Sequence, residues 1–185
     1  MRAIGRSFLG LGLALLIAAV PVAAQREAPI KLSLGAGLTL PSGDFNDTYE
    51  MGWGGLGAVS YRPPVLPFAF RADLSLAQVN DETPLDLSDR MVYGTANLLY
   101  EFDIPETVVR PYLLGGAGIY NFNPGGDAAA GIGSETRFGF NAGIGLEVKP
   151  GQIGFFAESR LHHVIDPGDD VQFGAVVAGL RFGAF

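Results

Sequence analysis

A two-residue alternation over residues 136–148 constrains the fold of this chain more than any other feature of its sequence. The apolar row consists of Thr136, Phe138, Phe140, Ala142, Ile144, Leu146 and Val148. The other row consists of Arg137, Gly139, Asn141, Gly143, Gly145 and Glu147. Because successive side chains of a strand point to opposite faces, this pattern predicts a long strand with one apolar and one glycine-rich polar face.

The three glycines of the polar row indicate which face of the strand points towards the barrel interior. In a soluble sandwich the bulky row would face the core, and the outer row would be rich in Lys, Glu and Thr. Glycine weakens a strand unless a neighbouring group needs the space, and the interior of a narrow barrel creates that need. We therefore expect a barrel with apolar side chains outside and polar groups inside.

Seven further segments have strand character. Alternation is clear in residues 30–40, 68–76, 92–102, 153–161 and 173–182. Residues 52–62 and 108–122 are strand-like and rich in glycine, and their facing stays open. The total is about eight strands of roughly 9 to 12 residues, the length that a tilted strand needs to cross a bilayer.

The composition supports a membrane location. Of 185 residues, 48% are hydrophobic and 17% are charged. After the N-terminal segment no apolar run approaches the 18 or more residues of a spanning helix, so the chain would have to cross a membrane as strands. A secreted, lipocalin-like barrel is the soluble alternative.

The N-terminus has the pattern of an export signal. Arg2 and Arg6 precede an apolar run and a small-residue site, which predicts a signal peptide over residues 1–24, cleaved before Gln25, and a barrel domain over residues 25–185. An uncleaved anchor helix is the alternative. Loss of the two arginines would take the net charge from −7 to −9, which argues against nucleic acid as a partner. The chain has no cysteine, so disulfides cannot stabilise it.

The connections alternate in length. Short, proline-marked segments follow the second, fourth and sixth expected strands, whereas longer and mostly acidic segments follow the others. Short periplasmic turns and longer outer loops characterise up-and-down antiparallel transmembrane β-barrels of the outer-membrane type. An even number of strands allows closure, and a lumen of about eight strands is filled by side chains.

The charged residues of the polar rows are the candidate lumen residues. They are Lys31, Arg71, Asp73, Glu101, Arg137, Glu147, Glu158, Arg160 and Arg181. Buried charges must be paired, and the near balance of signs predicts a self-neutralising network that plugs the barrel. The alternative is a narrow porin-like channel, with some of these residues lining an ion path.

Aromatic residues gather near the expected strand ends, where they favour a girdle at the membrane interface. They are Trp53, Tyr61, Phe68, Phe70, Tyr100, Phe102, Tyr120, Phe122, Phe155 and Phe182. The alternative is that the same rings cap a soluble core.

The sequence gives little support to catalysis or metal binding. Ser159 and His162 would fall on opposite faces of one strand, so they cannot form a nucleophile and its base. The acidic segments 44–50 and 166–170 lack the spacing of an EF-hand, and solvated loops explain them more simply than calcium does. We assign no catalytic residue, metal ligand or cofactor, and a lipid A-modifying enzyme remains an alternative.

The C-terminal segment AGLRFGAF resembles the last strand of bacterial outer-membrane barrels, which ends in a glycine, a hydrophobic residue and alternating aromatic residues. The family is the outer-membrane beta-barrel domain group of small OmpA/OmpX-like proteins. The resemblance extends over most of residues 25–185, including GAGLTLPSGDF near the start. It implies an assembly signal, read by the barrel-assembly machinery, at Gly179, Leu180, Phe182 and Phe185. Phe182 and Phe185 are three residues apart, so they would face opposite sides.

The sequence therefore predicts an integral barrel of the outer membrane with a structural or surface-interaction role. Its expected partners are outer-membrane lipid, lipopolysaccharide and the assembly machinery, and we expect a monomer. A weaker hypothesis is that divalent cations link the acidic loops to lipopolysaccharide phosphates.

Overall fold

A computed structural model describes residues 29–42, 51–80, 88–125, 134–166, 168 and 170–183. The expected signal peptide and its cleavage site lie outside these residues. No helix in this part of the chain is long and apolar enough to span a membrane.

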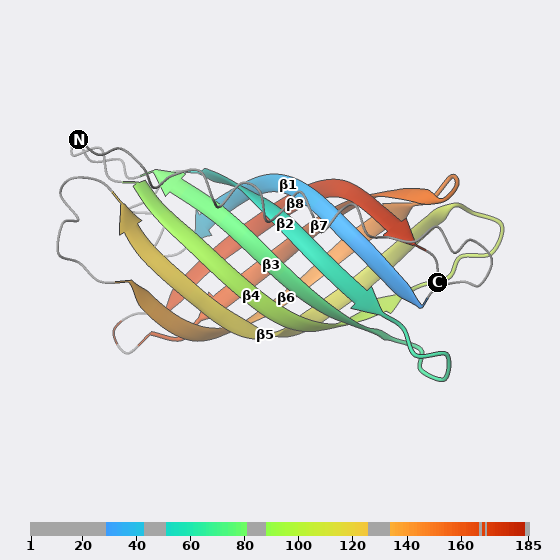
Figure 1. Cartoon of the computed structure of the whole chain (residues 1–185), viewed down its shortest axis with the longest axis horizontal. Helices are drawn as coiled ribbons and strands as arrows, with labels where there is room; N and C mark the ends of the chain where they lie inside the picture. The colour runs from blue at the N-terminus through green and yellow to red at the C-terminus, as the bar shows by residue number, and fades with distance from the viewer. Residues whose placement is uncertain are drawn as a thin grey trace, which may run out of the picture.

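Eight antiparallel strands close into a single barrel in chain order (Figure 1). The strands are β1 (Ile30–Ser42), β2 (Gly52–Tyr61), β3 (Ala69–Asn80), β4 (Ser88–Glu101), β5 (Val109–Gly125), β6 (Glu135–Val148), β7 (Ile153–Val164) and β8 (Val171–Gly183). The last strand pairs with the first from Lys31↔Gly183 to Ser42↔Gln172. Closure gives the backbone groups of both edge strands hydrogen-bonding partners. The expected eight-stranded up-and-down barrel is confirmed.

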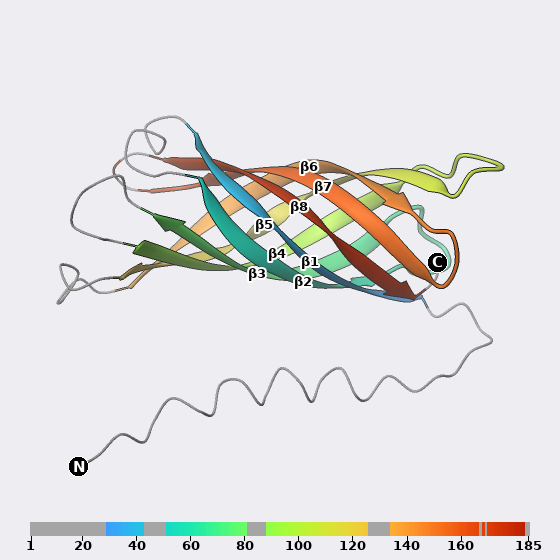
Figure 2. The ribbon, with the colours of Figure 1, turned by 90° about the horizontal axis from the view of Figure 1, so that it is seen from above.

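The connections after β2, β4 and β6 and the start of β1 and end of β8 lie at one end of the barrel, here called the turn end (Figures 1 and 2). The opposite end, called the loop end, carries the other connections. Several strands reach further towards the loop end than the alternation predicted. Thus β3 continues to Asn80 and β4 begins at Ser88, because pairing between them persists through residues expected to be loop.

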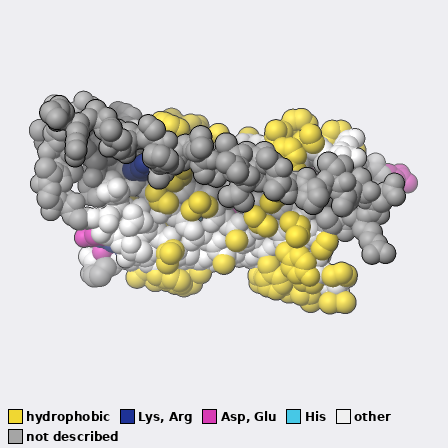
Figure 3. Space-filling view, in the orientation of Figure 1, with side chains coloured by type: hydrophobic (Ala, Val, Ile, Leu, Met, Phe, Trp, Pro, Cys, Tyr) yellow, Lys and Arg dark blue, Asp and Glu magenta, His cyan; other side chains and the backbone are white. Residues whose placement is uncertain are grey.

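The apolar rows face outwards and the polar rows face inwards. Leu74 and Ile144 are 59% and 62% exposed on the outer wall, whereas Arg71 and Glu147 are 2% and 1% exposed inside. On the visible face, hydrophobic side chains gather in patches along the wall, and the charged groups that can be seen lie towards its ends (Figure 3). This arrangement is the one expected from the glycine-rich row of residues 136–148.

The two strands whose facing was open are now placed. In β2, Leu56, Ala58 and Ser60 point into the barrel. In β5, Tyr112 and Tyr120 are buried. Tyr120 therefore does not belong to the outer aromatic girdle in which the sequence placed it. Both rows of β5 contain small residues, so the sequence did not show which row faces the interior.

Inward-facing glycines make room for large side chains of neighbouring strands. A Cβ atom on Gly143 would lie 2.8 Å from Cγ of Arg160, and one on Gly139 would lie 2.9 Å from Cε2 of Tyr120. A Cβ on Gly145 would collide with the ring of Tyr112. At Gly139 and Gly143 an added Cβ would also meet backbone carbonyl oxygens, of His163 at 2.6 Å and of Ser159 at 2.5 Å, so the glycines of β6 accommodate both the lumen side chains and the neighbouring strand.

Candidate functional site

The lumen near the turn end holds four charged residues, here called the turn-end layer: Lys31, Glu101, Glu147 and Arg181. Nζ of Lys31 lies 2.9 Å from Oε1 of Glu101 and 3.0 Å from Oε2 of Glu147. Nη1 of Arg181 lies 2.9 Å from the same Glu147 oxygen, and Arg181 also donates to Oγ of Ser33. Each carboxylate is therefore shared by more than one cation.

A second group of charges, the central layer, lies further into the barrel and consists of Arg71, Asp73, Glu158 and Arg160. Arg71 lies 2.8 Å from Asp73 and 2.7 Å from Glu158. Arg160 lies 2.9 Å from Asp73 and also pairs with Glu158. Asn97 donates to Asp73 over 2.6 Å, so this carboxylate has a neutral donor as well.

Tyr112 joins the two layers. Its hydroxyl donates to Glu158 over 2.8 Å and accepts from Nη2 of Arg181 over 3.2 Å. Its ring also lies under the Arg181 guanidinium, 4.8 Å from centroid to Cζ. The result is a continuous network of charge-assisted hydrogen bonds through about half of the barrel.

The two layers balance in charge. Four cations and four anions make them up, and each residue is no more than 6% exposed. A buried charge is tolerated only when it is paired and hydrogen-bonded, and here the opposite charges meet within the lumen. Arg62, which is part-exposed at the turn end, adds a 2.8 Å ion pair to Glu101.

Arg137 lies apart from the other eight residues that the sequence assigned to the lumen network. It sits near the loop end of β6, opposite Tyr120, and pairs with Glu135 and Asp166. Its side chain is 22% exposed. Arg137 faces inwards, but it lies closer to the loop end than the rings of Tyr93, Tyr120, His162 and Phe173, which separate it from the central layer.

Four rings close the barrel beyond the central layer, and we call Tyr93, Tyr120, His162 and Phe173 the aromatic layer. His162 stacks on Phe173 with ring centroids 4.5 Å apart, and Tyr93 stacks on Tyr120 at 5.2 Å. The Tyr120 hydroxyl lies 2.9 Å from Nδ1 of His162. This layer was not predicted from the sequence, although Phe173, Tyr93 and His162 share the parity of the polar rows.

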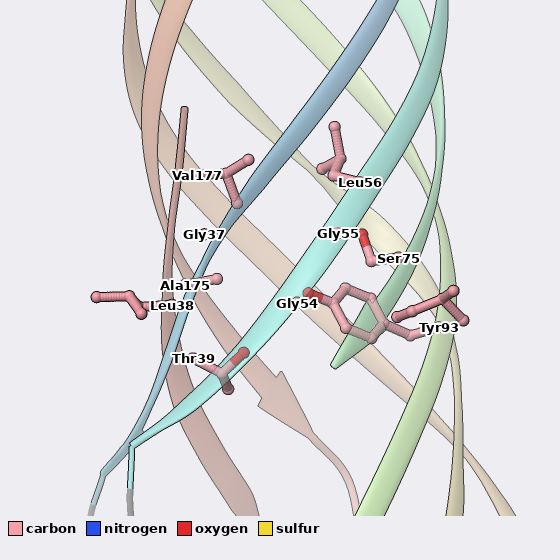
Figure 4. A pocket seen from close by; sticks show the side chains of 11 residues that line it. Gly37, Leu38, Thr39, Gly54, Gly55, Leu56, Ser75, Tyr93, Ala175 and Val177 are labelled. Atoms are coloured by element: carbon pink, nitrogen blue, oxygen red, sulfur yellow. The ribbon is translucent and has the colours of Figure 1, made fainter. Parts of the chain in front are cut away.

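A cavity beside the aromatic layer measures about 10 Å³ and is lined by Gly37, Gly54, Ser75, Tyr93 and Ala175 (Figure 4). The lining comes from β1, β2, β3, β4 and β8. A space of this size is at the lower limit for one water molecule.

The histidines do not form the catalytic arrangement weighed from the sequence. Ser159 is exposed on the outer wall, whereas His162 is 2% exposed inside. His163 also faces outwards and lies 3.2 Å from Asp170. Ser159 and His163 are four residues apart on one strand, about 13 Å, which is too far for a hydrogen bond.

Among the described residues, no three or more His, Cys, Asp or Glu side chains lie together so that they could hold a metal ion. The acidic segment 44–50 lies outside the described residues. In the segment 166–170, Asp166 receives a backbone hydrogen bond from Gly168 and donates its own N–H to Asp170. These contacts are those of a hydrogen-bonded turn.

Three of the four residues predicted to form the assembly signal lie near the turn end of β8. Gly179 faces inwards, Leu180 and Phe182 face outwards, and Phe185 lies outside the described residues. Gly183 has φ +105°, a left-handed conformation that favours glycine. Its carbonyl accepts from Nζ of Lys149 over 2.9 Å, and burial together with nearby Lys31 lowers the pKa of Lys149.

Comparison with known proteins assigns the family. The family model for the outer membrane protein beta-barrel domain matches residues 11–182. The chain belongs to this family. Membership and the similar structures below place the protein in the outer membrane, so the turn end is its periplasmic end. No curated protein matches the chain.

Solved outer-membrane barrels share the fold. Neisserial surface protein A matches with a TM-score of 0.67 at 16% identity, covering 85% of this chain and 99% of that chain. Ail, the attachment invasion locus protein of Yersinia pestis, matches with 0.53 at 18%, covering 85% and 100%. The outer membrane enzyme PagL matches with 0.52 at 15%, covering 82% and 98%. At these identities the likeness concerns the fold alone.

Proposed function

We propose that this outer-membrane barrel is a closed, non-conducting protein with a structural or surface-interaction role. The observation that carries the proposal is the filled lumen, in which the two charged layers and the aromatic layer follow one another across the membrane. A solute on this path would have to separate buried ion pairs, and breaking one such pair costs about 3–5 kcal/mol.

The decisive experiment is a conductance measurement on a preparation whose folding is verified by an unboiled-versus-boiled gel shift. We expect an electrically silent protein in a planar bilayer. A matched variant, Arg71→Ala with Glu158→Ala, removes one buried pair of opposite charges and tests whether opening the central layer creates a path. Steady conductance by the unmodified protein would support the narrow porin-like channel instead.

We also propose that the protein is a monomer whose acidic loops face the cell exterior, among lipopolysaccharide. The closed β1–β8 seam supports a self-sufficient barrel, because no strand edge is left to pair with another chain. The mass of the detergent-solubilised protein, corrected for bound detergent, should correspond to one chain. Divalent cations should increase its association with lipopolysaccharide if they link the acidic loops to phosphates.

A lipid A-modifying enzyme is the competing function, and the fold shared with PagL makes it worth testing. The facing of Ser159 and His162 argues against that pair as nucleophile and base. We expect no turnover of lipid A or phospholipid by the folded barrel. Turnover that disappears in His162→Ala or His163→Ala would establish the enzyme.

A further inference from the structure

A groove on the outer wall lies outside the lumen and has no part in the function proposed above. It spans β4 and β5 near the turn end and is an open, shallow depression of about 340 Å³. Among the seven residues that line it are Phe68, Leu98, Tyr100, Leu113 and Gly115. All are apolar except for the hydroxyl of Tyr100, so the groove suits a hydrocarbon ligand.

Gly115 forms the floor of the groove, and packing inside the barrel does not require a glycine at this position. A Cβ on Gly115 would meet one neighbour, the carbonyl oxygen of Asn141, at an ordinary 3.6 Å. The next residue, Gly116, faces inwards, and a Cβ there would collide with the backbone of Ala96. Packing within the protein therefore explains Gly116 but not Gly115, whose missing side chain leaves the outer wall open.

Two edge-to-face aromatic pairs fix the orientation of the rings in the walls of the groove. The rings of Phe68 and Phe70 lie 5.6 Å apart at 81°, and those of Tyr100 and Phe102 lie 4.9 Å apart at 79°. This geometry is the favourable one for aromatic rings, and it limits their rotation. The groove is thus preformed, which reduces the entropy lost when a ligand binds.

The position of the groove indicates which kind of molecule binds there. It is continuous with the lipid-facing wall, where Leu98 and Leu113 are 49% and 48% exposed. It lies at the periplasmic end, beside the aromatic residues of the membrane interface. Seven lining residues are far fewer than the 20–30 a side of a typical protein interface. We propose that the groove binds one acyl chain of a glycerophospholipid from the periplasmic leaflet.

Native mass spectrometry of the barrel, extracted from vesicles of palmitoyl-oleoyl phosphatidylethanolamine, tests the proposal. We expect one phospholipid to stay bound as detergent is increased. Gly115→Leu, which fills the floor, should lower its occupancy at least tenfold, and Gly115→Ala should lower it less. Gly57→Leu is the matched control, because Gly57 also faces outwards with open space, where a Cβ would meet Leu34 at 3.8 Å.

A second measurement locates the bound chain. In a Trp53→Phe, Tyr100→Trp variant the single tryptophan lies on the groove wall, and phospholipid with brominated chains should quench its fluorescence. Quenching should weaken when Gly115→Leu is added. Equal lipid occupancy in the unmodified, Gly115→Leu and Gly57→Leu barrels would overturn the proposal. A dimer that Gly115→Leu disrupts would overturn it as well, because the occupant would then be a second copy.

Discussion

At the scale of single residues, the interior is organised by pairs of a glycine and a large side chain. Gly145 faces the ring of Tyr112, which in turn joins the two charged layers. Glycine weakens a strand, yet here it allows a tyrosine to reach the barrel axis. The outward glycines have no such partner, so the two classes should respond differently to substitution.

Gly145→Val should destabilise the barrel by about 1–3 kcal/mol through overpacking against Tyr112. Urea unfolding, followed by the boiled-versus-unboiled gel shift, measures the effect. Gly57→Val is the control and should change stability by less than about 0.5 kcal/mol, since its side chain would point into lipid. Equal effects at the two positions would contradict the steric account of the inner glycines.

Arg181 and Arg137 provide a second residue-scale contrast, because only Arg181 belongs to the buried layers. Arg181→Met should cost about 3–5 kcal/mol, since it leaves Glu147 and Glu101 with less compensation. Arg137→Met should cost at most about 1 kcal/mol, because its ion pairs lie at the part-exposed rim. The same unfolding assay ranks the two variants, and a larger loss at Arg137 would refute the placement of these residues.

At the scale of strands, alternation predicted most of the architecture. The period of two gave the rows of β1, β3, β4, β6, β7 and β8, the glycines of the polar rows indicated which row faces inwards, and the alternating connection lengths gave the strand order. Alternation could not orient β5, where the run Gly115–Gly118 puts small residues on both faces. The aromatic layer was not predicted, because alternation places Phe173 on the inward row but does not show that it lies at the same height as Tyr93, Tyr120 and His162.

The turn between β4 and β5 contains a strained residue. Glu106 has φ 62°, a left-handed conformation that costs a residue with a side chain roughly 1–2 kcal/mol. Glu106→Gly should therefore stabilise the barrel by about 1 kcal/mol, in contrast to most glycine substitutions. The urea midpoint reports the gain, and Thr107→Gly, in the same turn, should give none.

At the scale of the whole molecule, the lumen network depends on contacts between distant parts of the chain. Lys31 pairs with Glu147 across 116 positions. The sequence indicated that the polar rows would be buried and nearly neutral, but not which cation meets which anion. That pairing depends on the stagger between strands, which fixes the height of each residue in the barrel. The same stagger removes Arg137 from the network.

Burial of the network should make its contribution insensitive to salt. Between about 0.01 and 1 M salt the Debye length falls from about 30 to 3 Å, but ions do not enter a filled lumen. The stability difference between the unmodified protein and Arg181→Met should therefore stay constant over this range. The smaller difference for Arg137→Met should shrink, because solvent ions reach the rim.

Because the carboxylates in the lumen are shared, the charged lumen residues should not change independently of one another during evolution. Glu147 serves Lys31 and Arg181 at once, and Glu158 serves Arg71 and Arg160. Replacing one anion would remove a partner from two cations at once and leave the lumen with excess positive charge, so tolerated changes should arise as compensated sets. Related barrels are then expected to differ inside by whole exchanged groups of charges, while their lipid-facing positions drift one at a time.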